Sequence, residues 1–249
     1  IGLLSQMKYT AREVGVSPLI SLKTAANELA QPGLDTGILA VELLKENKKE
    51  KQNPKKSKQS QPKTNQKPPL KIGGKYIFKK NNLAGKLTER ETRGYMWVDG
   101  QLKQSIIILK FPDNPQNLVT VVASGISSKI KPVINNNQPG IKLKIKAKGK
   151  ITSLTQPVKT IKEKNKNIDQ LEQRMAQVIR NDIKLVLDRT QSLKSDIFGF
   201  GNSFYRLKYK KWLTMKDNWR QIFSDLPVQI TVETDIKREG MINDSIKSR

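Results

Sequence analysis

The amino-acid sequence predicts an α+β fold: an antiparallel β-sheet meander packed against a long amphipathic helix and a shorter, aromatic-rich helical segment. Three observations support this prediction. Residues 141–151 alternate between apolar side chains and lysines, the period of a strand with one buried face. Residues 167–195 place apolar side chains along one helical stripe. Residues 196–223 hold eight of the fourteen aromatic side chains, which indicates either a core or a contact surface.

The N-terminal segment predicts the end of a small α/β unit. Residues 7–13 are weakly helical, and Ser17-Pro18 predicts the cap and first turn of a helix that Pro32-Gly33 ends. A short apolar strand follows at 37–44. The chain starts at Ile1 rather than Met, so we expect any targeting segment to lie outside it. No apolar run approaches the roughly 18 residues of a membrane helix.

A basic segment follows this unit. Between Lys45 and Lys71 there are ten lysines, two glutamates, four prolines and no aromatic residue. Such a composition buries too little apolar surface to offset its ordering entropy, so we predict a disordered linker over 46–71. The linker separates 1–45, the end of a preceding domain, from a C-terminal α+β domain over 72–249. Residues 72–100 are a candidate subdomain of their own.

The first elements after the linker have clear boundary signals. A strand is predicted at 75–78 and a turn at Asn81-Asn82. A helix is predicted over 87–97, with Thr88 as N-cap and Glu91 completing a capping box. Asp99-Gly100 then predicts a turn.

The middle of the chain is predicted to be β-structure. Strands are expected at 106–111, 118–123, 129–134, 141–151 and 228–236, with turns at 112–115 and 135–140. The lysine face of 141–151 is either a solvated surface or a cationic stripe for a partner, and we favour the solvated surface. If the last strand lies beside it, Glu233 and Asp235 should pair with these lysines.

The helical segments surround a glycine corner. Asn167 with Gln170 is the predicted N-terminal cap of the long helix. Two glycines at 199 and 201 permit a tight bend, after which Asn202 or Ser203 is predicted to cap a second helix extending to 211. A single stripe of Trp212, Met215, Trp219 and Phe223 follows at helical spacing. This spacing favours a core over a nucleic-acid surface, although basic residues lie between the aromatics.

Composition limits the function. The chain has neither cysteine nor histidine, which excludes disulfides, a cysteine nucleophile, a histidine base and Cys/His zinc sites. No glycine-rich phosphate loop or dinucleotide fingerprint is present. We therefore expect no enzyme activity and no cofactor. The net charge of +25 predicts attraction to an acidic partner, either nucleic acid, anionic lipid or an acidic polymer.

Residues 196–223 resemble the C-terminal part of the Ger(x)C, or GerAC-type, spore germination proteins. The run from Phe78 to Thr88 and the Glu-Thr-Arg-Gly run after it resemble a second segment of that family. The motif positions, expected in the core or at a partner contact, are Gly85, Asp196, Phe198, Gly199, Phe200, Gly201, Trp212, Trp219 and Phe223. The resemblance covers about 72–242, and 14–44 loosely; Tyr209 stands where the family usually has proline.

The resemblance implies a non-enzymatic C subunit of a nutrient germinant receptor, acting with A-type and B-type membrane subunits. It also implies a lipoprotein on the outer face of the spore inner membrane. Because the chain lacks cysteine, its lipid anchor would lie outside this sequence. Anionic lipid is a candidate partner of the basic surface. The alternative is a sequence-independent nucleic-acid binder, for which the sequence shows no recognisable module.

Overall fold

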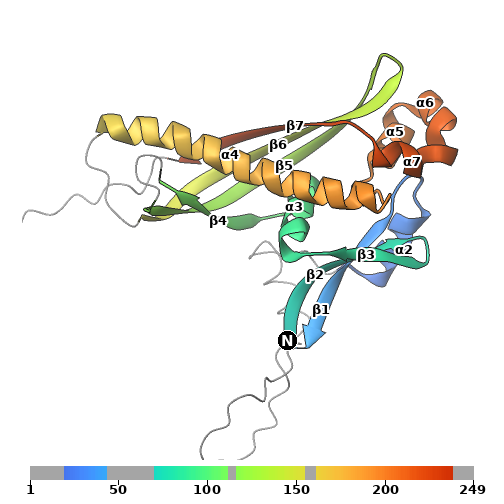
Figure 1. The fold of residues 1–249 in the computed structure, drawn as a ribbon, viewed down its shortest axis with the longest axis horizontal. Helices are drawn as coiled ribbons and strands as arrows, with labels where there is room; N and C mark the ends of the chain where they lie inside the picture. The colour runs from blue at the N-terminus through green and yellow to red at the C-terminus, as the bar shows by residue number, and fades with distance from the viewer. Residues whose placement is uncertain (1–19, 44–69, 112–115, 155–160, 238–249) are drawn as a thin grey trace, which may run out of the picture.

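The computed structural model describes residues 20–43, 70–111, 116–154 and 161–237, and it confirms the α+β class (Figure 1). Two sheets have the strand orders β1-β2-β3 (sheet A) and β4-β5-β6-β7 (sheet B). The strands are β1 (Thr36–Leu43), β2 (Leu70–Lys79), β3 (Asn82–Leu87), β4 (Gln104–Lys110), β5 (Leu118–Asn135), β6 (Gln138–Leu154) and β7 (Val228–Lys237). The helices are α2 (Leu22–Ala30), α3 (Glu89–Asp99), α4 (Ile161–Ser192), α5 (Phe200–Leu207), α6 (Tyr209–Met215), the 3-10 turn η1 (Lys216–Asn218) and α7 (Trp219–Ser224).

Sheet A joins residues from both sides of the predicted linker. Strand β1 pairs antiparallel with β2, from Thr36 opposite Phe78 to Leu43 opposite Leu70. The prediction of a linker as far as residue 71 is therefore wrong at its C-terminal end, because pairing with β1 extends the strand back to Leu70. Strand β3 was not predicted; it follows a turn in which Lys80 has a positive φ of 54°.

Helix α2 begins later than predicted. Its N-cap is Ser21, whose hydroxyl accepts a hydrogen bond from the Thr24 backbone N–H at 3.0 Å. The predicted Ser17-Pro18 cap and the weak helix at 7–13 lie outside the described residues, as does the turn at 112–115.

Strand β5 is one strand of 18 residues where the sequence predicted two. Its pairing with β6 shifts register between Ser124 and Ser127, around Gly125 with a φ of +56°. A β-bulge accommodates the polar, glycine-containing residues between the two predicted strands, so that β5 continues through them as one strand. At the far end Asn136 and Asn137, both with positive φ, form the two-residue hairpin turn into β6.

The alternation of β6 is confirmed, with its apolar side chains buried and its lysines exposed. Strand β7 lies beside β6 but parallel to it, so the meander is antiparallel only as far as β6. A parallel neighbour requires a crossover, which α4 to α7 supply. The Glu233 carboxylate pairs with Lys144 at 2.5 Å and with Lys146 at 3.4 Å, which confirms the predicted pairing of this acidic residue with the lysine face.

Helix α4 lies across one face of sheet B (Figure 1). Leu171, Met175 and Ile179 of its apolar stripe are buried in the core that the helix shares with the sheet. Asn167 lies inside α4, which begins at Ile161, so the predicted cap is wrong. Among the helices that the structure describes, none is long and apolar enough to cross a bilayer.

Helix α3 packs against α4 and lies between the two sheets (Figure 1). Its capping box of Thr88 and Glu91 is confirmed, and Gly100 in a left-handed conformation ends it. Arg90 and Arg93 donate to the two oxygens of the buried Asp182 carboxylate of α4 at 2.9 and 2.8 Å.

The aromatic segment forms short helices rather than the two that were predicted. The chain breaks at Lys208, with φ −142° and ψ 46°, so α5 ends at Leu207 and α6 begins at Tyr209. Asn202 and Ser203 lie inside α5, and Gly199 occupies its N-cap without a side-chain hydrogen bond. The prediction of an Asn202 or Ser203 cap is therefore wrong. The backbone N–H groups at the start of α5 donate to a different side chain.

Candidate functional site at the Asp196 corner

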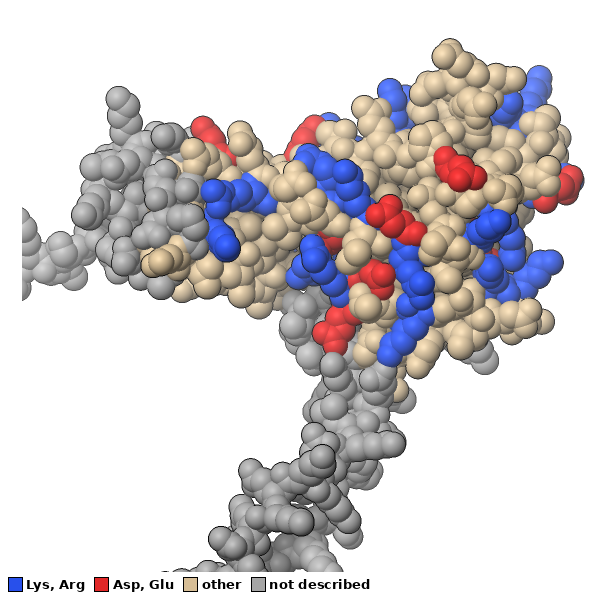
Figure 2. Space-filling model, in the orientation of Figure 1, with Lys and Arg blue, Asp and Glu red and all other residues tan. Residues whose placement is uncertain are grey.

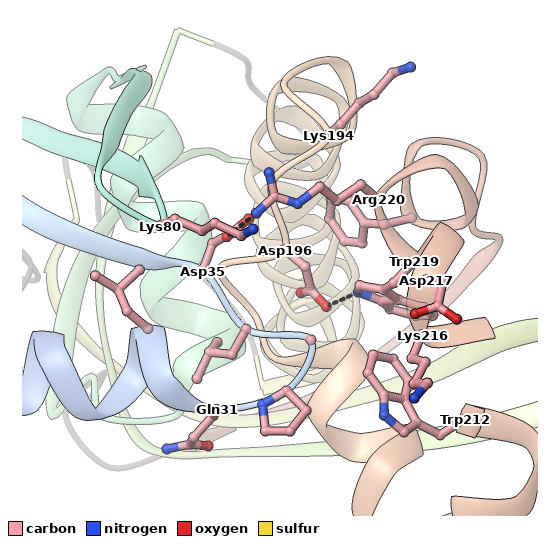
Figure 3. A pocket seen from close by; sticks show the side chains of 15 residues that line it. Gln31, Asp35, Lys80, Lys194, Asp196, Trp212, Lys216, Asp217, Trp219 and Arg220 are labelled. Atoms are coloured by element: carbon pink, nitrogen blue, oxygen red, sulfur yellow. Dashed lines mark hydrogen bonds and ion pairs between the residues drawn. The ribbon is translucent and has the colours of Figure 1, made fainter. Parts of the chain in front are cut away.

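The backbone N–H groups at the start of α5 donate to the buried carboxylate of Asp196. Its Oδ1 accepts hydrogen bonds from the backbone N–H groups of Phe198 at 3.2 Å and Phe200 at 3.1 Å. Its Oδ2 accepts from the Gly201 N–H at 2.7 Å and from the Trp219 indole Nε1–H at 3.1 Å (Figure 3). One carboxylate thus satisfies donors at the start of α5 and fixes a tryptophan of α7.

The two glycines of the corner meet different requirements. Gly199 has a φ of +71°, a left-handed conformation that costs other residues energy. Gly201 lies where a Cβ atom would come within 2.6 Å of Trp219 Nε1 and 2.8 Å of the Gly33 Cα atom. The corner therefore allows the N-terminal segment, α5 and α7 to meet at van der Waals distance.

The N-terminal segment is clasped to this corner through Asp35. The Asp35 N–H donates to the Asp196 carbonyl oxygen at 2.8 Å. The Ser195 hydroxyl donates to Asp35 Oδ2 at 2.9 Å, and Arg220 Nη2 of α7 donates to Asp35 Oδ1 at 3.3 Å. We call these contacts of Asp35, Asp196, Ser195 and Arg220 the aspartate clasp.

The aromatic motif residues pack behind the clasp. Trp219 contacts Phe204, Trp212 and Phe223, with ring centroids 5.7, 5.4 and 6.5 Å away. Phe200 lies 6.2 Å from Phe223. All five side chains are buried in the main core. Their packing makes the stripe part of the core, the arrangement that its helical spacing favours.

Phe198 lies at the edge of this network. It is half-buried, and its ring stacks against Phe200 at 5.2 Å and against Tyr95 of α3 at 5.9 Å. The corner thereby contacts α3 as well as α5 and α7.

Burial governs the electrostatics of the clasp. Burial raises the pKa of Asp196 to about 7, although the N–H donors of Gly201, Phe200 and Trp219 act in the opposite direction. Burial also raises the pKa of Asp35, against the effects of Ser195 and Arg220. Both carboxylates have hydrogen-bond partners at each oxygen. Their geometry therefore suits a structural role, in which they join the N-terminal segment to α5 and α7.

A cavity of about 460 Å³ opens beside the clasp (Figure 3). Its lining combines the loop after α2, the aromatic floor and the basic residues Lys80, Lys194, Lys216 and Arg220. The acidic residues Asp35, Asp196 and Asp217 also line it, so its charge is nearly balanced. Among the described residues, no three His, Cys, Asp or Glu side chains are grouped to hold a metal ion.

The predicted motif residues do not all lie at this site. Gly85 of β3 lies apart from the cavity, where a Cβ atom would come within 2.9 Å of Leu193 Cδ1 beyond the end of α4. Sequence reasoning missed Gly33, Asp35 and Ser195. Asp35 and Ser195 are 160 residues apart, so no local pattern could connect them.

A second buried ionisable group lies under sheet A. Lys75 of β2 is 2 % exposed, and its Nζ lies 4.5 Å from the centroid of the Tyr95 ring. Burial lowers the pKa of Lys75 to about 8, against the effects of the Asp99 and Glu28 carboxylates.

Residues 196–223, all of which the structure describes, do not present the aromatic platform that the nucleic-acid alternative needs. Of the eight aromatics in 196–223, only Tyr205 and Tyr209 are exposed. Acidic and basic side chains interleave over the middle of the face seen in Figure 2.

Comparisons with known proteins support the family resemblance. A family profile described as Spore germination B3/GerAC like, C-terminal, matches residues 73–240. Spore germination protein KC of Bacillus subtilis (strain 168) is 25 % identical over 162 residues, covering 65 % of this chain and 39 % of the relative. Spore germination protein B3 of the same organism is 28 % identical over 182 residues, covering 72 % and 47 %. The chain thus spans less than half the length of either relative.

A solved structure shares the fold. The crystal structure of the GerBC protein superposes with a TM-score of 0.67 at 23 % identity, covering 88 % of this chain and 61 % of that one. The profile covers well over half of the chain, including most of β2, all of β3 to β7, and Ser195, Asp196 and Arg220 of the aspartate clasp; Asp35 lies outside it. This chain therefore belongs to the spore germination B3/GerAC-like, C-terminal family, as the resemblance of its motifs predicted.

Proposed function

We propose that this chain is part of the non-enzymatic C subunit of a nutrient germinant receptor, acting in spore germination. The observation that carries the proposal is the family match over 73–240. The relatives named as spore germination proteins KC and B3 support the same process.

The proposed partners are the A-type and B-type membrane subunits of such a receptor. In this arrangement the protein lies on the outer face of the spore inner membrane, held by a lipid anchor outside the sequence given. The family domain of this proposal spans residues 73–240, the range of the family match, and strand β1 joins it by pairing with β2.

The motif residues are proposed to serve the fold rather than a nutrient site. Asp196 has donors at both oxygens, and Trp212, Trp219 and Phe223 are buried. Their side chains offer little free surface to a small molecule. In this proposal the clasp keeps the N-terminal segment fixed on the C-terminal helices, so that the domain moves as one body.

Two measurements on spores test the proposal. Deleting the gene in its source organism should slow the loss of refractility when at least one nutrient is added, and the complete gene should restore it. Affinity purification of the tagged full-length protein from detergent-solubilised spore membranes should recover A-type and B-type subunits. Unchanged germination with every nutrient, together with recovery of neither subunit, would refute the receptor function.

The basic composition adds an expectation for the membrane itself. Each well-placed lysine or arginine contributes about 1 kcal/mol of attraction to an anionic leaflet. We expect the protein to bind vesicles that contain anionic lipid, with an affinity that falls as salt is added. Equal binding to neutral vesicles would contradict this expectation.

A further inference from the structure

Exposed apolar side chains gather at one corner of the molecule, on α5 and α6. Tyr205, Leu207, Tyr209 and Leu213 are 39, 62, 53 and 45 % exposed. Tyr209 and Leu213 are one helical turn apart on α6, and the rings of Tyr205 and Tyr209 meet edge to face at 5.7 Å. We call these four side chains the tyrosine–leucine corner. Contiguous exposed apolar groups of this kind mark interaction surfaces.

The corner is held rigidly from behind. Phe204, Trp212 and Met215, on the other faces of the same helices, are buried in the main core. Lys211 Nζ donates to Asn137 Oδ1 at 2.8 Å, which ties α6 to the tip of the β5–β6 hairpin. Figure 1 shows α5 and α6 at one extremity of the molecule. A partner therefore meets a preformed surface and bears little ordering cost.

The segment that carries the corner has charges of one sign, although Glu28 and Asp99 line a cavity with Arg206 and Leu207. Between Asp196 and Asp217 the sequence has no acidic residue, and its basic residues are Arg206, Lys208, Lys210, Lys211 and Lys216. Residues 205–210 are all exposed and alternate between apolar and basic side chains. Within the described part of the chain, none of these five cations forms an ion pair with a carboxylate.

The other cationic surface includes carboxylates. The exposed lysines of β6 lie beside Glu233 and Asp235 of β7, and Glu233 pairs with Lys144 and Lys146. The residues of β7 that face the same way are polar or charged. Part of the lysine charge is therefore neutralised within the protein. The exposed Ile106 and Ile108 of β4 lie on the same face of sheet B, but only at the Lys150 end of the lysine row, because Ile106 is opposite Val122 and Val122 is opposite Lys150.

We propose that the tyrosine–leucine corner is the surface that contacts an anionic lipid bilayer. Leu207 and Leu213 enter the boundary between headgroups and acyl chains, and the two tyrosine rings lie at the headgroup level. The surrounding lysine and arginine side chains reach the lipid phosphates. The inference rests on the proposed membrane location, and it adds which face of the domain lies on the membrane.

Binding to vesicles of phosphatidylglycerol and phosphatidylcholine tests the corner with matched variants. Lys208→Gln/Lys210→Gln should weaken binding roughly 30-fold, because each lysine accounts for about a factor of five to six. Lys142→Gln/Lys148→Gln removes the same charge from β6 and should change binding less than threefold, roughly. Equal losses in both pairs would overturn the assignment to the corner.

The apolar part of the contact has its own pair of variants. Leu207→Gln/Leu213→Gln should weaken binding by roughly tenfold or more. Ile106→Gln/Ile108→Gln changes two side chains of similar exposure, 54 and 62 %, on β4 and should leave binding unchanged. The melting temperatures should match the wild type, because all four positions are exposed.

A direct readout uses the absence of native cysteine from the chain. An environment-sensitive fluorophore on Leu207→Cys should shift to the blue and be quenched by brominated lipid when vesicles are added. The same label on Ile108→Cys should show neither change.

The outcomes separate this inference from the receptor proposal. Vesicle binding with a response at position 108 rather than 207 would overturn the corner but leave the membrane location intact. Tighter binding to single-stranded DNA than to vesicles, lost in the corner variants, would assign the surface to nucleic acid instead. If the corner variants keep vesicle binding but lose A-type and B-type subunits, the corner is a protein interface and the inference fails.

Discussion

At the scale of single residues, the Asp196 carboxylate accepts more hydrogen bonds than any other side chain of the aspartate clasp. Asp196→Asn keeps one acceptor oxygen but turns an amide donor toward the N–H groups of Gly201 and Trp219. We expect the free energy of unfolding to fall by about 3 kcal/mol, the cost of leaving buried polar groups unpaired. Urea denaturation measures it. Asp217→Asn, at an exposed position in η1, is the control and should be neutral.

Lys75 predicts a pH dependence. Its folded pKa of about 8 lies below the ordinary value of 10.5, so between these values the unfolded state binds more protons. The free energy of unfolding should therefore rise with pH, by about 2 kcal/mol between pH 8 and pH 9.5. Urea titrations at the two pH values measure the change.

The control removes the charge and keeps the length of the side chain. Lys75→Met should abolish most of the rise, because methionine does not titrate. If the variant gains stability over this range as the wild type does, other groups cause the effect.

At the scale of elements, the aromatic stripe makes α6 and α7 part of the core. Trp219→Ala removes a side chain that is 5 % exposed and contacts three other aromatic rings. We expect a loss of about 3–5 kcal/mol in the free energy of unfolding. Tyr209→Ala, at 53 % exposure, should cost less than about 1 kcal/mol. An unchanged melting temperature in Trp219→Ala would contradict the burial of the stripe.

Elements with a strong internal period could be predicted from sequence. The lysine alternation of β6 and the apolar stripe of α4 are such patterns, and the capping box of α3 is a local signal. Strand β3 has no such period, since it contains a glycine and begins at the second residue of the Asn81-Asn82 turn signal. The two halves of β5 were separated in the prediction because a bulge interrupts the period without ending the pairing.

At the scale of the whole molecule, the prediction could not reach contacts between distant segments. The motif residues of 196–223 were found because they lie within 28 residues of one another. The clasp was not found, because Asp35 becomes significant only when β1 and the end of α4 meet. The parallel direction of β7 was equally hidden, because it depends on the path of the crossover.

Gly201 allows the N-terminal segment and α7 to pack closely against each other. A Cβ atom there would come within 2.6 Å of Trp219 Nε1 and 2.8 Å of the Gly33 Cα atom, so Gly201→Ala should separate the N-terminal segment from α7. We expect faster amide exchange in β1 and little change in β7, because the opening is local. Hydrogen exchange with mass spectrometry measures both.

Gly140→Ala is the matched control for this variant. Its added methyl would meet Pro227 at an ordinary contact distance of 3.4 Å. It should leave exchange in β1 unchanged, and equal acceleration in both variants would indicate global rather than local opening.

The aspartate clasp also sets an order of events during synthesis. Asp35 leaves the ribosome 160 residues before Ser195, and the α7 residue Arg220 follows later still. At about 5–20 residues per second, the N-terminal segment waits roughly 8–32 s for its partners. Strand β1 can pair with β2 in that interval, but the loop that carries Asp35 cannot reach its final position. The last contacts to form at this corner therefore join Asp35 to residues made 160 or more positions later.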